Sequence, residues 1–409
     1  MKRKHVNKRI LILILGGLAA IGPFSIDMYL PAFGVISRDL NTDIAAIGYS
    51  LTAYFFGICF GQLLYGPLID RFGTKRPLLG GLMLFVATAA GCAVSVNVNS
   101  LIALRAFQAL GGCVGMVAGR AIVRDLFPVN EIAEIFSSIT LVMGIAPIIA
   151  PTVGGFIVSF AGWRYIFWAL AVFGAFMFAS TLLLFSETAG ADPAASLRPV
   201  KILKNYFGVL KNSDFAVYTI SSSALASIMF AYISGSPFIY MKLFGLTEQQ
   251  FGWVYAVNSF GLISGSQSNR LLLKKFTCRQ ISLFGTFLQV LICLSLIAAA
   301  ANVSVSHVPV FVLIFLFLVV NGVLNPNMMA LAMEPFAKSA GSASAMLGFM
   351  NMLFGALATC LVSFLQNGTA VPMAVVMAVC ALISFVSLFG HNLFTGVSNK
   401  GIVDGNCAE

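Results

Sequence analysis

The sequence predicts an all-α protein that crosses a membrane twelve times, and three observations carry this prediction. Of the 409 residues, 59% are hydrophobic and only 9% are charged, whereas soluble domains are about 25% charged. Apolar runs of about 20 residues, the length that a helix needs to cross a bilayer, recur along the whole chain. The basic residues behind the net charge of +10 lie in the short segments between these runs. Their placement indicates membrane topology rather than binding to nucleic acid.

The twelve apolar runs are separated by short polar segments. The predicted spans are 10–32, 44–68, 77–96, 100–123, 134–160, 164–186, 214–240, 250–272, 280–301, 308–332, 340–366 and 371–393. Most Lys and Arg residues fall on one side if the N-terminus is cytoplasmic. Because cytoplasmic loops carry the excess of basic residues, we expect both termini on the cytoplasmic side.

The longest polar gap separates six spans from six. The expected parts are an N-terminal six-helix bundle (1–186), a cytoplasmic linker (187–213), a C-terminal six-helix bundle (214–393) and a cytoplasmic tail (394–409). The loop GPLIDRFGTKR after the second span is echoed by GSQSNRLLLKK after the eighth. Duplicated halves in the same orientation are typical of transporters with a substrate site between the halves. The fold class is therefore two pseudo-symmetric bundles of six helices.

Two charged residues lie well within the predicted spans. Asp27, in FSIDMYLPAF, and Arg105 each lie about five residues below the outer end of their span. At about 1.5 Å per residue, both lie roughly 8 Å below the outer surface, which is a geometric condition for pairing. Charged groups at such depth usually pair or line a wet cavity. Pro31 removes the helical partner of the Asp27 carbonyl and should loosen the helix at this turn.

Several motifs resemble one transporter family over essentially the whole chain. GPLIDRFGTKR (66–76) matches the loop signature of the major facilitator superfamily, and LIALRAFQ (101–108) matches its buried-arginine motif through Arg105. APIIAPTVGG (146–155) resembles the proline–glycine antiporter motif in a variant form. DMYLPA (27–32) and SGSPF (234–238) are similar to the bicyclomycin-resistance (Bcr/CflA) branch of drug–proton antiporters. This resemblance implies the twelve-helix fold of that family and a multi-pass protein of the bacterial inner membrane.

The resemblance also implies two sets of residues that govern movement of the halves. Asp70 would hold the positive end of the helix that begins near Ala340, because an acid stabilises a helix N-terminus. The expected conformational latch comprises Asp70, Arg71, Gly73, Lys75, Arg76, Arg124 and Asp125. The expected half-interface motif comprises Pro147, Pro151, Gly154 and Gly155. Its prolines lack an amide hydrogen and predict a kinked helix.

Asp27 and Arg105 are the predicted proton-coupling pair. Arginine stays protonated and cannot carry the proton, whereas a carboxyl group can gain and lose one as its surroundings change. A static ion pair that merely holds two helices, or an Asp27 that faces the headgroups, are the alternatives. Candidate substrate-binding residues are polar or adaptable side chains at suitable depth: Tyr29, Tyr54, Gln108, Met143, Asn258, Asn321 and Asn325.

The leading functional prediction is export of drug-like or toxic small molecules in exchange for protons, by alternating access. The alternative is a proton-coupled carrier for a specific metabolite such as a nucleoside, a sugar or an amino-acid derivative, and the direction of transport stays open. The sequence has no H-E-x-x-H, G-x-S-x-G or nucleotide-loop motif, so we expect neither an enzyme nor self-contained ATP-driven pumping. We expect no metal and no cofactor. The expected partners are the substrate, protons and the lipid bilayer, with no nucleic acid, and the chain is expected to act as a monomer.

Overall fold

The computed structural model describes residues 8–127, 129–185, 187, 208–302, 307–336 and 340–394. Within these ranges the regular structure is helical and no strand occurs. Eleven helical segments of the described part are long and apolar enough to cross a membrane. The remaining predicted span, 250–272, also forms a long helix, but its Gln, Asn and Ser residues make it more polar than the others. The all-α multi-pass prediction is therefore confirmed.

The first six predicted spans form helices that are interrupted at two places. The helices and turns are α1 (Lys8–Asp27), η1 (Leu30–Ala32), α2 (Phe33–Asp39), α3 (Ile44–Phe72), α4 (Lys75–Ala93), α5 (Val98–Gly112), α6 (Val114–Leu126), α7 (Val129–Ala161) and α8 (Arg164–Leu184). The predicted span 10–32 ends its α-helix at Asp27, as expected from Pro31. The predicted span 100–123 divides at Cys113 into α5 and α6, which the sequence reading did not anticipate.

The last six predicted spans each form one long helix. They are α10 (Ser213–Pro237), which continues into the π-helical turn η2 (Phe238–Leu243), α11 (Glu248–Leu272), α12 (Cys278–Ala301), α13 (Val308–Met333) with the 3₁₀ turn η3 (Glu334–Phe336), α14 (Ala340–Phe364) and α15 (Val371–Phe394). Most of the predicted linker and of the tail lies outside the described residues.

The chain forms two compact units. Among the described residues, unit 1 holds those up to 187 and also 246–256, whereas unit 2 holds 208–245 and the residues from 257 onward. The division therefore passes through α11. Its first turns belong to unit 1 and its remainder belongs to unit 2.

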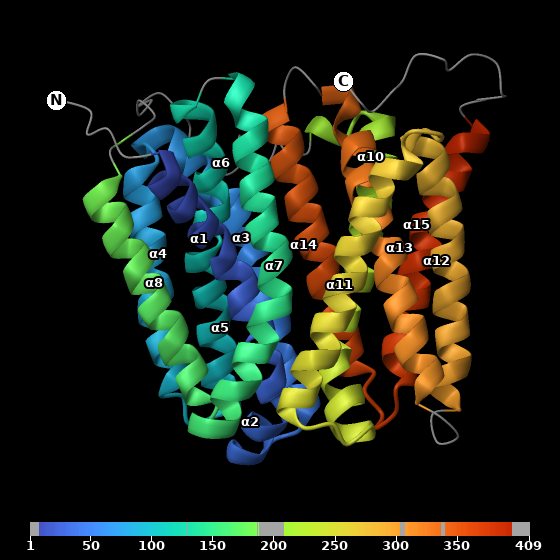
Figure 1. The fold of residues 1–409 in the computed structure, drawn as a ribbon, viewed down its shortest axis with the longest axis horizontal. Helices are drawn as coiled ribbons and strands as arrows, with labels where there is room; N and C mark the ends of the chain where they lie inside the picture. Colours follow the sequence, from blue (N-terminus) through green and yellow to red (C-terminus); the bar gives the residue numbers. More distant parts are fainter. Residues whose placement is uncertain are drawn as a thin grey trace. The chain divides into compact units, whose positions relative to one another are not determined.

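Helix pairing follows the same pattern in each unit. In unit 1, α1 packs on α7, α4 packs on α5 and α4 packs on α8. In unit 2, α10 packs on α14, α12 packs on α13 and α12 packs on α15. Figure 1 shows the helices of each unit running side by side along most of their length. This recurrence agrees with the duplication that the two loop sequences suggested.

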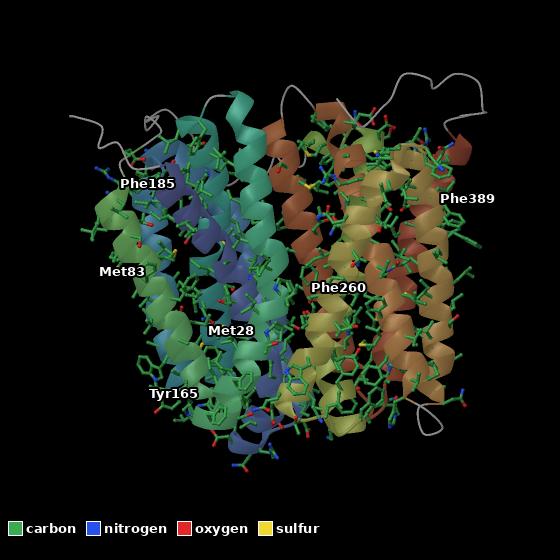
Figure 2. All side chains as sticks on the ribbon, in the orientation of Figure 1. Met28, Met83, Tyr165, Phe185, Phe260 and Phe389 are labelled. Atoms are coloured by element: carbon green, nitrogen blue, oxygen red, sulfur yellow. The ribbon has the colours of Figure 1, made fainter. Side chains whose placement is uncertain are left out.

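Large apolar side chains cover the outer surface of both units. Met83 and Tyr165 in unit 1 and Phe389 in unit 2 project from their helices (Figure 2). Phe160 in α7 is 82% exposed, although it is an apolar side chain. Such a surface is unfavourable in water and favourable against lipid tails.

Glycines allow the closest approaches between helices. A Cβ atom added at Gly265 in α11 would overlap the carbonyl oxygen of Val319 in α13, and one at Gly57 in α3 would overlap the carbonyl oxygen of Ala106 in α5. Small residues at such positions let helix backbones pack directly, which drives helix association in membranes.

We expect Gly265→Ala to lower the thermal stability of the protein. The added methyl group has to displace backbone, and overpacking of this kind costs about 1–3 kcal/mol. The measurement is the midpoint of thermal unfolding in detergent micelles. Gly80→Ala is the matched control, because a Cβ atom at Gly80 meets nothing within 4 Å. Equal midpoints for the two variants would contradict the close-packing account.

Candidate functional site

The first membrane-spanning helix of unit 1 is broken after Asp27. The α-helix ends at Asp27, and after two residues the 3₁₀ turn η1 carries Pro31 at its start. Met28, Tyr29, Leu30 and Pro31 are all buried. A break in a buried helix leaves backbone groups to be satisfied by neighbours, which is why such breaks mark cavities and functional sites in membrane proteins.

Asp27 is buried at this break. Only 4% of its surface is exposed. The hydroxyl group of Tyr255, in the first turns of α11, donates a hydrogen bond of 3.1 Å to Oδ1 of Asp27. Tyr255 is 2% exposed. In the described part of the chain, this tyrosine is the hydrogen-bond donor to the carboxylate.

Arg105 is fully buried in a cage of aromatic rings. Its guanidinium carbon lies 4.1 Å from the centre of the Tyr54 ring, 4.6 Å from that of Tyr29 and 5.7 Å from that of Phe167. Positive charge above an aromatic face is stabilised by the ring quadrupole, and more so when water is excluded. The aromatic rings thus accommodate a cation that has no exposed surface.

The hydrogen bonds of Arg105 go to neutral oxygens. Nη1 donates to Oε1 of Gln108 at 2.7 Å, and Nη2 donates to the backbone carbonyl oxygen of Ser25 at 3.0 Å. The Nε atom has no hydrogen-bond partner among the described residues. Arg105 therefore ties α5 to the last turn of α1.

The predicted neighbourhood of Asp27 and Arg105 is present, but the predicted ion pair is not formed. The bond from Arg105 to the carbonyl of Ser25 places the guanidinium beside the turn that ends at Asp27, which agrees with the expected equal depth. In the described part of the structure, however, the carboxylate binds Tyr255 and no salt bridge joins it to Arg105. The break of α1 lets the Ser25 carbonyl take the position that the carboxylate was expected to fill.

The predicted proline–glycine motif of α7 lies beside the same break. A Cβ atom at Gly154 would overlap the carbonyl oxygen of Met28, the residue that follows Asp27. A Cβ atom at Gly155 would lie 2.7 Å from the carbonyl oxygen of Glu248 at the start of α11. Pro147 and Pro151 lie within α7. The motif thus lets α7 approach both the broken end of α1 and the first turn of α11.

Three of the predicted substrate-binding residues contact Arg105. Tyr29 and Tyr54 contribute two faces of the aromatic cage, and Gln108 accepts a hydrogen bond from the guanidinium. The hydroxyl group of Tyr29 also lies 2.8 Å from Oγ of Ser50. All three are buried. Met143 in α7 is half-buried.

The other predicted substrate-binding residues lie in unit 2. Nδ2 of Asn258 donates to the hydroxyl groups of Tyr232, at 3.0 Å, and Tyr240, at 3.2 Å. Asn321 is buried, and its Nδ2 atom has no hydrogen-bond partner among the described residues. Asn325 is exposed. The structure therefore does not gather these three asparagines into a single hydrogen-bonded cluster.

Five of the seven predicted latch residues lie in and around the turn between α3 and α4: Asp70, Arg71, Gly73, Lys75 and Arg76. Asp70 and Arg76 are exposed and Arg71 is half-buried. The other two, Arg124 and Asp125, belong to α6, and their side chains lie outside the described part of the structure. The role of these residues as a latch stays a prediction.

Lys75 and Gly73 make contacts that the sequence reading did not expect. Nζ of Lys75 donates to the carbonyl oxygens of Leu182, at 3.0 Å, and Phe185, at 2.5 Å, at the end of α8. In turn, Oε1 of Glu187 accepts from the backbone amides of Thr74 and Lys75 at the start of α4. Gly73 has a φ of 81°, and a Cβ atom there would lie 2.7 Å from the Glu187 carboxyl group. Each helix end is thus capped by a side chain of opposite charge to its dipole.

Sequence reading missed several residues of this site. Tyr255 was not singled out, although it precedes Asn258 by three positions and so lies on a neighbouring part of the same helix face. Phe167, Tyr232 and Tyr240 were likewise not distinguished from other aromatic residues. Nothing in the order of the chain indicates that Tyr255 approaches a carboxylate 228 positions away.

Comparison with known proteins gives the family. The profile of the Major Facilitator Superfamily matches residues 15–359. The chain belongs to this superfamily. It is 34% identical to an uncharacterised transporter of the same type, YdgK of Bacillus subtilis, over 93% of this chain and 94% of the relative. A bicyclomycin resistance protein homolog of Haemophilus influenzae is 30% identical, over 93% of this chain and 95% of the relative.

Solved structures of superfamily members have the same fold. The nucleoside transporter NupG aligns with a TM-score of 0.73 over 94% of this chain and 98% of that protein, at 17% identity. The relationship to the bicyclomycin resistance homolog confirms the resemblance that the motifs suggested. The protein is thus a multi-pass membrane transporter of the major facilitator superfamily, with two six-helix bundles, rather than an enzyme.

Proposed function

We propose that this transporter exports drug-like or toxic small molecules across the bacterial inner membrane in exchange for protons. It would act as a monomer by alternating access, with both termini in the cytoplasm. The name of the Haemophilus influenzae relative, a bicyclomycin resistance homolog, supports an efflux role for this chain. No cofactor enters the proposal, because the proton gradient supplies the free energy.

The observation that carries the proposal is the burial of Asp27 at the break in the first helix. A carboxyl group that is 4% exposed, at the broken end of a membrane helix, would be costly to keep as a purely structural element. Its hydrogen bond is to a neutral tyrosine rather than to a cation. Because the guanidinium of Arg105 donates to Gln108 and to the Ser25 carbonyl, protonation of Asp27 removes no hydrogen-bond partner from this cation.

The proposed cycle uses these two residues differently. Asp27 takes up a proton from the outer side and releases it to the cytoplasm, while the substrate moves in the opposite direction. Arg105 stays protonated throughout and fixes α5 to α1 beside the proton site. One proton that crosses about 100 mV contributes about 2.3 kcal/mol. That free energy supports roughly a 50-fold concentration gradient of a neutral substrate.

The first test combines a growth screen with a transport assay. Cells that express the protein are grown on a panel of toxic compounds that includes bicyclomycin, and a compound to which they become resistant is used in everted membrane vesicles. We expect this compound to accumulate in vesicles whose interior is acidified. Each addition of the compound should release protons from the vesicle interior. The proposal would be contradicted if uptake stayed unchanged after the pH gradient was collapsed. It would also be contradicted if the protein transported a metabolite in preference to every toxic compound tested.

A further inference from the structure

The first turns of α11 contact the other helices of unit 1 at three levels. Near the start of the helix, Glu248 packs against Gly155 of α7, and Oε1 of Glu248 lies 3.9 Å from Nη2 of Arg38. One turn further on, a Cβ atom at Gly252 would lie 3.0 Å from the carbonyl oxygen of Pro151. At the end of this segment, Tyr255 donates its hydrogen bond to Asp27. The segment 248–256 therefore packs along α7 and is hydrogen-bonded near its end to the last residue of α1.

These contacts differ in how they respond to a change of charge. The ion pair between Arg38 and Glu248 is long, and the Arg38 side chain is 75% exposed. This pair therefore contributes little to the stability of the contact. The glycine contacts are made with uncharged backbone groups and do not depend on protonation. The bond from Tyr255 to Asp27 is buried at both ends, and a hydrogen bond to an ionised carboxylate is about twice as strong as one between neutral groups. Among these contacts, it is the one that neutralisation of Asp27 would weaken.

The other titratable groups near Asp27 are occupied elsewhere. On α3 and α5, Tyr54 and Arg105 face each other, and the guanidinium binds Gln108 and the Ser25 carbonyl. Tyr29 is bound to Ser50. On α8, Arg164 is bound to Asp39 at 2.6 Å. The part of α7 with described side chains from 142 to 161 contains no charged residue. Among the described residues, Tyr255 is thus the one whose hydrogen bond is made directly to the Asp27 carboxylate and changes in strength with its charge.

We propose that Tyr255 is a positioning residue that couples the protonation of Asp27 to the docking of the first turns of α11 on unit 1. The ionised carboxylate accepts the tyrosine hydroxyl and holds the segment 248–256 in place. Protonation of Asp27 weakens this bond and loosens the segment. Because α11 continues into unit 2 from residue 257, the change reaches the second unit along a continuous helix. This inference rests on the proposed role of Asp27 as the proton carrier.

The first test measures the titration of Asp27 directly and needs no substrate. Infrared difference spectroscopy of the full-length protein in lipid, recorded over a pH series, follows the carboxyl band that Asp27→Asn removes. The Tyr255 hydroxyl favours the ionised form, so Tyr255→Phe should move the midpoint of this band to higher pH by about one unit. The control is Tyr65→Phe, which removes a buried hydroxyl elsewhere in unit 1 and should leave the midpoint unchanged.

The second test follows the docking of α11 by hydrogen exchange of the backbone amides in 247–257, corrected for the intrinsic effect of pH. In the wild type, exchange should be slow when Asp27 is ionised and at least threefold faster when it is protonated. In Tyr255→Phe, it should be fast under both conditions. The inference would be overturned if Tyr255→Phe had the same infrared midpoint as the wild type. It would also be overturned if the amides of 247–257 exchanged at the same rates in Tyr255→Phe and in the wild type. A failure of drug–proton exchange in vesicles would contradict the proposed function and leave both of these readings unchanged.

Discussion

Replacing Asp27 with Asn is expected to abolish accumulation of the transported compound against its gradient while leaving its binding intact. The substitution keeps the size of the side chain and removes the group that gains and loses a proton. A concentration ratio of roughly 50-fold at about 100 mV should fall to about one. The measurement is uptake into acidified vesicles, together with binding of the same compound to the purified variant.

The control for this variant is Asp43→Asn. Asp43 is an exposed acid of the same unit, directly before α3, and its side chain makes no cap hydrogen bond there. It should accumulate the compound like the wild type. If Asp27→Asn still concentrates the compound in response to the pH gradient, Asp27 is not the proton carrier.

Replacing Arg105 with Met is expected to destabilise the protein as well as to stop transport. The variant loses the bonds to Gln108 and to the Ser25 carbonyl and leaves both acceptors buried without a donor. Two hydrogen bonds from a charged donor contribute about 3 kcal/mol together, before the loss of the aromatic contacts is counted. The midpoint of thermal unfolding in detergent should therefore fall by several degrees or more.

Two further variants separate charge, geometry and surface effects at Arg105. Arg105→Lys keeps the positive charge and loses the planar fork that reaches two acceptors at once, so it should recover only part of the lost stability. Arg270→Met removes an exposed arginine of unit 2 and should unfold close to the wild-type temperature. Wild-type stability of Arg105→Met would show that the buried cation does not hold α5 to α1.

Helix positions and the break in α1 could be predicted from the sequence, because both depend on local properties. Apolar runs of sufficient length require helices in a bilayer, and Pro31 removes the amide that would continue the helix past Asp27. The contact between Arg105 and Gln108 also follows from their spacing, since residues three positions apart share a helix face. The break at Cys113 has no comparable proline signal.

The partners of the buried charges could not be predicted in this way. Equal depth correctly placed Arg105 beside the last turn of α1, but depth does not determine which oxygen a guanidinium binds. In the structure, the Ser25 carbonyl accepts the bond that was assigned to Asp27. Asn269 shows the same limit, since its reciprocal hydrogen bonds with Asn327 of α13 depend on how two helices pack. Such contacts depend on rotation of helices about their axes, which apolar runs do not specify.

The most direct test of the central claim is the number of protons that the purified protein releases when it binds the transported compound. The protein is placed in weakly buffered solution near the pH at which the Asp27 carboxyl band is largely present, and a pH indicator records the release. If Asp27 carries the coupling proton, the wild type should release close to one proton for each bound molecule and Asp27→Asn should release none. Equal release from the wild type and from Asp27→Asn, at equal binding, would contradict the account.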